Sequence, residues 1–316
     1  MKNLLNTLTI SLIIILVFSG CKQSGNQQNT TDDTTKTVDL SKYGLDTSFV
    51  NKLNTIKAGE VGDIIQSFPS PVEMAALIED MKVPFAKKYL FSTDAANGFD
   101  TNFKKALALG VYSADLGYLN VYGRTGEVIQ YLVTIRRISD DLRIGQFFDF
   151  QTLKRLATNN TNLDSLLILS VQSYHNMDEY LRTNDRSNLS ALMVTGVWFE
   201  SLYLAGQVYK ESPNAEMLDR IGSQKNILAS LMAVLVKFIN TDENFALLIG
   251  EFKELYLAYK DVEIEIIEKE DTETFINGVY VKTQGSTSIV KINEQQINRI
   301  IAATEKIKSK IESSLK

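Results

Sequence analysis

The chain has 316 residues, of which 44% are hydrophobic, with 33 Lys and Arg residues against 38 Asp and Glu residues. A single Cys and a single His cannot make a disulfide or a four-ligand structural zinc site. The net charge of −5 argues against a broad electrostatic contact with nucleic acid.

Residues 1–20 are predicted to be a signal peptide. Lys2 precedes an apolar run from Leu8 to Phe18, which is too short for a membrane span of roughly 20 residues. The run ends in Phe18-Ser19-Gly20-Cys21, which resembles the lipobox of bacterial lipoproteins, although Leu is usual where this chain has Phe18. The resemblance implies cleavage before Cys21, diacylation of its thiol and acylation of the new amino terminus. The alternative is an ordinary secretory signal peptide followed by an unpaired cysteine.

Residues 21–42 are predicted to be the lipidated cysteine and a disordered polar tether. Gln, Asn, Thr, Ser and Asp dominate positions 22–39, and Val38 is the single aliphatic residue there. Such a segment cannot bury enough apolar area to offset the entropy of ordering it. Lys22 follows the cysteine, and lipoproteins that lack Asp at this position usually proceed to the outer membrane. The resemblance therefore implies an outer-membrane anchor, with the protein facing either the periplasm or the surface.

Apolar spacing is helical almost throughout residues 43–316. Ser70-Pro71-Val72-Glu73 predicts the start of a helix that runs to Met81, and Asp100-Thr101 is expected to cap a helix over 102–122 that stops at Gly123. Further helices are predicted at 125–142, 150–158, 162–182, 186–209, 223–239, 243–262 and 293–314, with a small additional helix at 214–217. The expected fold is an all-α, multi-helix bundle of antiparallel helical hairpins.

Two stretches allow more than one interpretation. Residues 227–239 are apolar nearly all round, but the run is short and contains Lys237, so a central buried helix is favoured over a membrane span. Residues 263–292 show alternating apolar positions and an Asn277-Gly278 turn, which predict a small β-hairpin or meander. The first part of this stretch also fits an extension of the preceding helix.

A faint internal repeat has an offset of 86 residues. Gly110-Val111-Tyr112 corresponds to Gly196-Val197-Trp198, and both segments lie inside predicted helices. Because glycine inside a helix costs roughly 1 kcal/mol relative to alanine, its presence in both copies predicts close helix packing there. A duplicated helical hairpin, in the manner of tetratricopeptide-like arrays, would explain the match, and coincidence is the alternative.

Two acidic residues occupy similar positions in the repeated helices. Asp115 follows Tyr112 near an apolar face, with Arg136 expected within reach across the next turn, and Glu200 has the same kind of setting. The structural interpretation, which we favour, is two partly buried carboxylates satisfied by Arg or by Tyr hydroxyls. The functional alternative is an aromatic pocket between helices 102–122 and 186–209 that binds a small molecule or glycan. Its predicted ligand-binding residues are Tyr112, Asp115, Tyr118, Trp198 and Glu200.

No recognisable catalytic set accompanies these residues. His175 lacks a serine-nucleophile motif, and the chain has no phosphate loop, dinucleotide fingerprint or calcium loop, so no cofactor or metal is predicted. A hydrolase that uses carboxylates alone is not excluded by residue counts.

The sequence as a whole is similar to all-helical lipoproteins of Gram-negative bacteria. Its lipobox, polar tether and helical hairpins carry that resemblance, from which only Cys21, as the lipid attachment point, is taken over. The leading hypothesis is a non-enzymatic, outer-membrane-anchored lipoprotein with a helical interaction or scaffolding domain. Its expected contacts are the membrane, through the lipid, and an envelope protein, without nucleic acid.

Overall fold

Helices provide nearly all of the regular structure in the computed structural model, which describes residues 38–57, 77–78, 81–157, 163–267, 272–276, 279–283 and 287–315. This arrangement confirms the predicted all-α, multi-helix fold. The predicted signal peptide, Cys21 and the helix start at Ser70 lie outside the described residues. The described residues form one compact helical unit. It begins with three short helical turns and one helix: η1 (Leu40–Tyr43), α1 (Thr47–Asn54), η2 (Lys87–Tyr89) and η3 (Thr93–Gly98).

The main helices follow the predicted order. They are α4 (Asn102–Val121), α5 (Thr125–Asp141), α6 (Phe150–Ala157), α7 (Leu163–Thr183), α8 (Ser187–Glu211), α9 (Ala215–Val236), α10 (Asn244–Ala258) and α11 (Glu294–Leu315), with the turn η4 (Gly145–Phe147) between α5 and α6. Helix α4 begins as predicted, because the Thr101 hydroxyl accepts a hydrogen bond from the Lys104 amide at 3.2 Å. Gly123, with a φ of +60°, follows its end.

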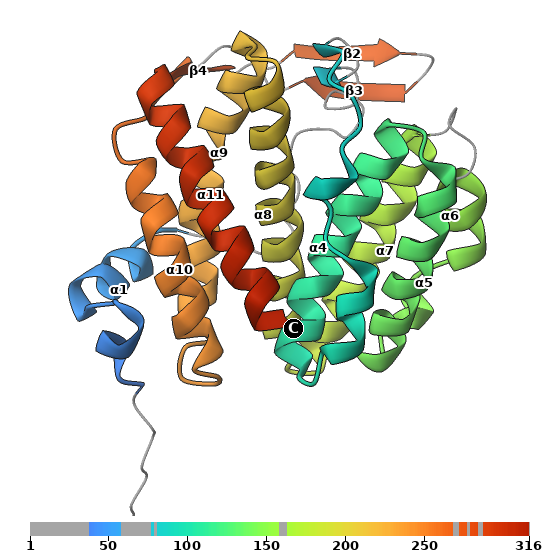
Figure 1. Cartoon of the computed structure of the whole chain (residues 1–316), viewed down its shortest axis with the longest axis horizontal. Helices are drawn as coiled ribbons and strands as arrows, with labels where there is room; N and C mark the ends of the chain where they lie inside the picture. The colour runs from blue at the N-terminus through green and yellow to red at the C-terminus, as the bar shows by residue number, and fades with distance from the viewer. Residues whose placement is uncertain are drawn as a thin grey trace, which may run out of the picture. The chain divides into compact units, whose positions relative to one another are not determined.

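Helices α4 and α8 form the largest helix–helix contact among the described residues and lie side by side at the centre of the unit (Figure 1). Helices α10 and α11 contact each other and α9 on one side, whereas α5, α6 and α7 pack on the other. From α4 to α10, consecutive helices contact one another across short connections, as expected for helical hairpins. A tetratricopeptide-like arrangement of these hairpins stays a prediction.

The two repeat glycines meet at the α4–α8 crossing. A Cβ atom placed on Gly110 would lie 2.1 Å from the carbonyl oxygen of Met193, and one on Gly196 would lie 2.2 Å from that of Leu107. Both neighbours are backbone atoms, which cannot rotate away. The close packing predicted from glycine in both copies is therefore confirmed, and the two equivalent positions face each other across one helix pair.

The predicted helices at 214–217 and 223–239 are a single helix, α9, so their separation was wrong. Asn214 caps it by accepting hydrogen bonds from the amides of Glu216 and Met217, at 2.8 and 3.3 Å. Gly222, which lies between the two predicted segments, packs against strand β4 (Thr287–Lys291), where a Cβ atom would be 2.5 Å from a methyl group of Val290. Residues 227–236 of α9 are largely buried, as predicted for a central helix.

The interval after α10 is β-structure rather than a helix extension. Strand β1 (Glu263–Ile267) pairs antiparallel with β4 (Thr287–Lys291), and β2 (Thr272–Ile276) pairs antiparallel with β3 (Val279–Thr283). Ile276 pairs with Val279, so the predicted hairpin is present, although Asn277 and Gly278 themselves lie outside the described residues. Helix α10 accordingly ends at Ala258, before the predicted residue 262.

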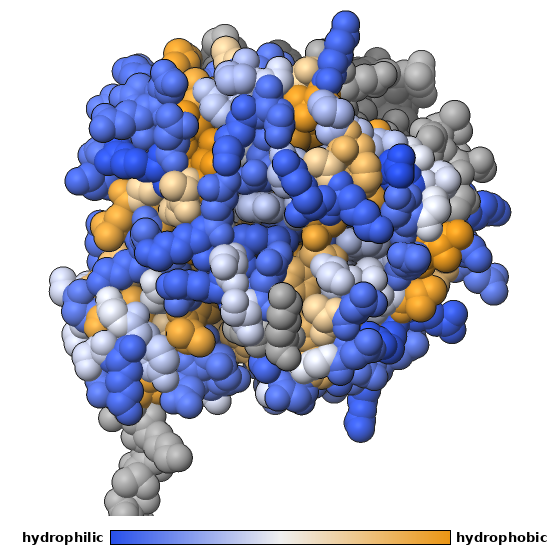
Figure 2. Space-filling model, in the orientation of Figure 1, coloured by the Kyte–Doolittle hydropathy of each residue, from blue (hydrophilic) through white to orange (hydrophobic). Residues whose placement is uncertain are grey.

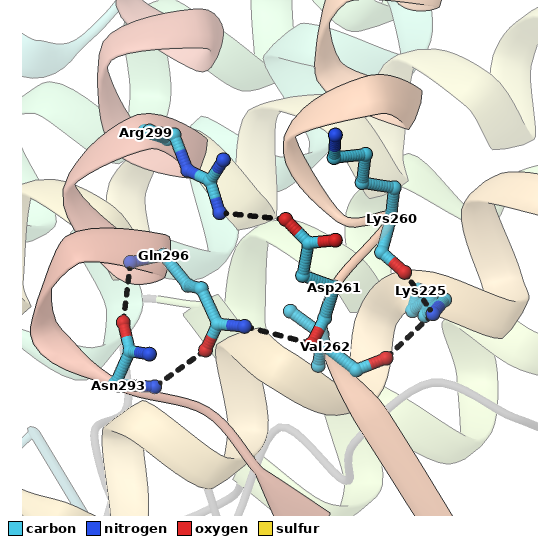
Figure 3. A network of polar contacts seen from close by, with 7 residues as sticks. All are labelled: Lys225, Lys260, Asp261, Val262, Asn293, Gln296 and Arg299. Carbon is cyan, nitrogen blue, oxygen red and sulfur yellow. Dashed lines mark hydrogen bonds and ion pairs between the residues drawn. The ribbon is translucent and has the colours of Figure 1, made fainter.

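A network of polar contacts fixes the junction where α10 gives way to β1 (Figure 3). From α9, Lys225 Nζ donates to the carbonyl oxygens of Lys260 and Val262, at 3.1 and 2.5 Å. From α11, Gln296 Nε2 donates to the Asp261 carbonyl at 2.7 Å. Asn293 and Gln296 also exchange backbone-to-side-chain hydrogen bonds at 2.7 and 2.9 Å, which is a capping box. These contacts hold the first turn of α11 in place.

Helix α8 is long and apolar enough to cross a membrane by length and composition, and it alone passes that test among the described residues. Within the unit, 78% of its most apolar stretch is buried. Its position beside α4 at the centre of the unit is that of a core helix.

Candidate functional site

The five residues predicted to bind a ligand are all buried in the core. Their exposed fractions are 0% for Tyr112, Asp115 and Glu200, 2% for Trp198 and 4% for Tyr118. Two surface hollows lie elsewhere, one along α11 from Glu294 to Ala302 and one where α5, η4 and α6 meet. Neither hollow is lined by any of the five. Neither hollow therefore gives a ligand access to these five residues, and ligand binding by them stays a prediction.

The polar atoms of the aromatic members are used inside the protein. The Tyr112 hydroxyl donates to the carbonyl of Ser92 at 2.7 Å, and the Trp198 ring N–H donates to Gln224 Oε1 at 3.0 Å. The Tyr118 hydroxyl accepts from the Ala86 amide at 3.4 Å. These rings behave as core residues whose polar ends are satisfied, which is the usual arrangement for buried Tyr and Trp.

Asp115, on α4, is bound by the backbone and not by Arg136. Its Oδ2 accepts a hydrogen bond from the Phe91 amide at 2.9 Å, and the Phe91 carbonyl in turn accepts from the Tyr131 hydroxyl at 2.8 Å. The expected Arg136 contact was wrong, because that side chain is 67% exposed and lies 3.8 Å from Asp140 of its own helix. On α5, the residue that faces the Asp115 region is thus Tyr131.

Glu200, on α8, pairs with Lys308 of α11. The Nζ atom of Lys308 lies 2.5 Å from Glu200 Oε1, and their side chains are 5% and 0% exposed. The same ammonium group lies 5.3 Å from the ring centre of Phe91 and 5.0 Å from that of Tyr203, both suitable for cation–π contact. We call Asp115, Glu200 and Lys308 the buried ionic cluster.

The two acids of the buried ionic cluster interact with each other. Burial raises the pKa of Asp115 well above its usual range, and the nearby charge of Glu200 and a hydrogen bond between the two side chains raise it further. Burial also raises the pKa of Glu200, but its contacts with Lys308 oppose that effect. Asp115 is therefore the more readily protonated of the two acids, whereas the ammonium group of Lys308 favours the ionised form of Glu200. The partners of these carboxyls are thus the Phe91 amide and Lys308 rather than the predicted Arg or Tyr side chains, and Asp115 Oδ1 and Glu200 Oε2 accept no hydrogen bond from a donor among the described residues.

Lys308 is the site residue that the sequence analysis missed. Helix α11 presents Ile297, Ile300, Ile301, Ile307 and Ile311 to the core, and Lys308 lies on the same stripe at helical spacing. A lysine among positions that otherwise hold isoleucine was the available signal. Its partner lies 108 residues earlier, which no local pattern identifies.

The remaining candidates lie apart from the cluster. His175 is exposed on α7. No group of three or more His, Cys, Asp or Glu residues that could hold a metal ion occurs within the described part of the chain. A chain of hydrogen bonds joins Tyr174, Ser190 and Asp178 beside His175, and Asp178 pairs with Arg182 at 3.2 Å.

No protein-family model, curated protein or solved structure matches this chain. The candidate site consequently rests on its own geometry. That geometry is an enclosed cluster of two acids and one ammonium group, in contact with aromatic rings and backbone. It can hold three helices together and bind a proton.

Proposed function

We propose that this protein is an outer-membrane-anchored lipoprotein whose helical domain serves as an interaction or scaffolding module rather than as an enzyme. The observation that carries the proposal is the segment Phe18-Ser19-Gly20-Cys21 after a short apolar run. Two or three acyl chains on Cys21 would give stable membrane attachment, whereas a single chain would be marginal.

The enclosure of the buried ionic cluster supports a non-enzymatic role. Asp115 and Glu200 are 0% exposed, and Lys308 is 4% exposed. A general acid or base must come within hydrogen-bond reach of its substrate. Groups enclosed between α4, α8 and α11 serve stability more readily than turnover.

Exposed apolar side chains support a role in protein binding. Val133 is 64% exposed and Ile129 is 40% exposed, one turn apart on α5, and Leu257 on α10 is 50% exposed. Apolar groups are visible at the surface on the α5 and α10 sides of the unit (Figure 2). We take the α5 pair as the first surface to test for contact with an envelope protein.

Replacing Cys21 by Ser is expected to release the domain from membranes, because the only thiol that can carry lipid is then absent. The measurement is the distribution of the protein between membrane and soluble fractions, together with incorporation of labelled fatty acid. Ser24→Ala, in the predicted tether, is the matched control and should remain lipidated and membrane-bound. Membrane association that survives in the Cys21→Ser protein would show that lipid on Cys21 is not the anchor.

Val133→Glu is expected to reduce capture of a partner by at least tenfold if the exposed α5 pair forms the contact, since a charge there opposes burial. The measurement is affinity capture of the full chain from detergent-solubilised membranes after cross-linking. Leu257→Glu makes the same change at a comparably exposed position and should leave capture intact. Capture unaffected by Val133→Glu would exclude the α5 surface, and no reproducible partner for the wild type would count against the interaction role itself.

A further inference from the structure

Three helices each place one ionisable side chain in the same enclosed part of the core. Asp115 comes from α4, Glu200 from α8 and Lys308 from α11, and none is more than 4% exposed. With both acids ionised, the cluster would have a net charge of −1, whereas with one proton added it is neutral. A net charge in a buried site is costly, so the charge balance favours the protonated state.

The hydrogen bonds of the cluster leave one oxygen of each acid without a partner in the described part of the chain, and one proton between these oxygens would supply it. Asp115 Oδ2 is taken by the Phe91 amide at 2.9 Å, and Glu200 Oε1 is taken by Lys308 at 2.5 Å. The other oxygens, Asp115 Oδ1 and Glu200 Oε2, have no partner when both groups are treated as acceptors. A hydrogen bond between the two side chains would give both oxygens a partner, and one acid must then donate, which only a protonated carboxyl group can do.

We propose that Asp115 and Glu200 hold one proton between them and that this proton is required to lock the C-terminal part of α11 onto α4 and α8. With the proton present, the four carboxyl oxygens have partners and the ammonium group of Lys308 balances the remaining charge. Without it, two adjacent carboxylates repel each other beside a single ammonium group. A buried net charge is stabilised when water reaches it, and water can enter when the part of α11 around Lys308 moves outward.

Different contacts hold the two halves of helix α11, which makes the proposal specific to one half of it. Its first turn is held by the capping box of Asn293 and Gln296 and by the bond from Gln296 to Asp261 (Figure 3). Further along, Lys308 makes a buried ion pair, whereas Lys306 and Lys310 pair with Glu254 and Glu251 of α10 nearer the surface. Loss of the proton therefore loosens the region around residues 304–313 and leaves the first turn in place.

Other charged and titratable groups face the cluster from the helices around it. Lys308 lies 3.8 Å from Glu312, which is 37% exposed. Three tyrosines lie nearby: Tyr112 of α4, Tyr131 of α5 and Tyr203 of α8. Burial raises the pKa of each above its usual value, so all three stay neutral at physiological pH. Phe91, from the segment between η2 and η3, contributes only its amide, its carbonyl and its ring. The shared proton is thus the group of the cluster that changes state as pH rises from acid to neutral.

The direction of the pH effect follows from the raised pKa of Asp115. Below about pH 4, the ordinary Asp range, the acid is protonated in both the folded and the unfolded chain, and the stabilising contribution of the cluster is complete. As pH rises, the unfolded chain releases this proton first and the folded chain keeps it. The folding equilibrium constant then falls by up to about tenfold per pH unit, and this fall ends once the pKa of the folded state is passed.

Asp115→Asn is the variant that tests the proposal. Its amide oxygen can accept from Phe91 and its amide N–H can donate to Glu200, which reproduces the protonated acid without a titratable proton. Denaturant unfolding of the full chain in detergent is measured from pH 4 to pH 9 for both proteins. We expect the ratio of the wild-type to the variant folding constant to fall by up to about tenfold per pH unit above about pH 4, and to level off once the pKa of the folded state is passed.

The control is Asp219→Asn, which makes the same change at an exposed position on α9 and should leave the slope of the wild type unchanged. Equal slopes for wild type and Asp115→Asn would overturn the proposal. If Asp115→Asn fails to fold, the infrared spectrum of the wild type decides. A carboxylic-acid C=O band that persists at neutral pH supports the shared proton, and its absence contradicts it.

Hydrogen exchange tests the location of the effect. After correction for the intrinsic effect of pH on exchange, amides of residues 304–313 should lose protection as pH rises, whereas those of 297–300 in the same helix should not. The difference should disappear in Asp115→Asn. Uniform loss along α11, or loss that persists in the variant, would contradict a lock at Lys308.

Discussion

Replacing Lys308 by Met is expected to lower the free energy of unfolding at neutral pH by about 3–5 kcal/mol. The reason is that Met fills the space of the Lys stem but leaves Glu200, which is 0% exposed, without its positive partner. An unpaired buried carboxylate must either remain charged at high cost or take up a second proton. Denaturant unfolding monitored by circular dichroism measures the loss.

A matched control lies two residues earlier on the same helix. Lys306 Nζ is 2.5 Å from Glu254, but both side chains are 53% exposed, so Lys306→Met should cost no more than about 1 kcal/mol. Combining Lys308→Met with Glu200→Gln should recover part of the loss, because the buried charge is then removed as well. A Lys308→Met protein as stable as the Lys306→Met protein would show that the buried pair does not hold α11 in place.

Gly110→Ala is expected to destabilise the fold by about 3 kcal/mol or more, at the upper end of the cost of overpacking a core. The added Cβ atom would lie 2.1 Å from the Met193 carbonyl oxygen and 2.7 Å from the Val197 amide nitrogen. Because both atoms belong to the backbone of α8, only separation of the two central helices relieves the clash. The same measurement of unfolding free energy reports the effect.

Gly117→Ala is the control for this substitution on the same helix. No atom lies within 4 Å of a Cβ placed on Gly117, so only the gain in helix propensity remains, about 0.5–1 kcal/mol in favour of the variant. The two substitutions should thus have opposite signs. Destabilisation of similar size at both positions would mean that the α4–α8 crossing is not what Gly110 serves.

Local signals in the sequence accounted for most of the helices and for the glycine crossing. Helical spacing and caps such as Thr101 depend on residues within one or two turns, which a sequence displays directly. The close contact at Gly110 and Gly196 could be predicted because glycine recurs at equivalent positions of two helices, whereas nothing local indicates the role of Gly222. There its role is to admit Val290 of β4, and that contact spans 68 residues of chain. A glycine that ends a helix and one that admits a distant strand look alike in sequence.

The candidate site was only half visible for the same physical reason. Asp115 and Glu200 stood out because acids on apolar helix faces need partners, and the structure places both in one cluster. Their counter-ion, Lys308, comes from a helix that packs against α8 through tertiary contacts alone. The expected partner, Arg136, was chosen because it lies close along the chain, but its side chain is 67% exposed and lies beside Asp140.

The mass of the mature N-terminus, purified from membranes, tests the proposed function most directly. Cleavage before Asp32 isolates a peptide that should begin at Cys21 and carry a diacylglyceryl group on the thiol and an acyl group on the amino terminus. A peptide of that mass is the result we predict. A peptide that begins elsewhere, or one that begins at Cys21 with a free thiol, would contradict a lipid-anchored protein.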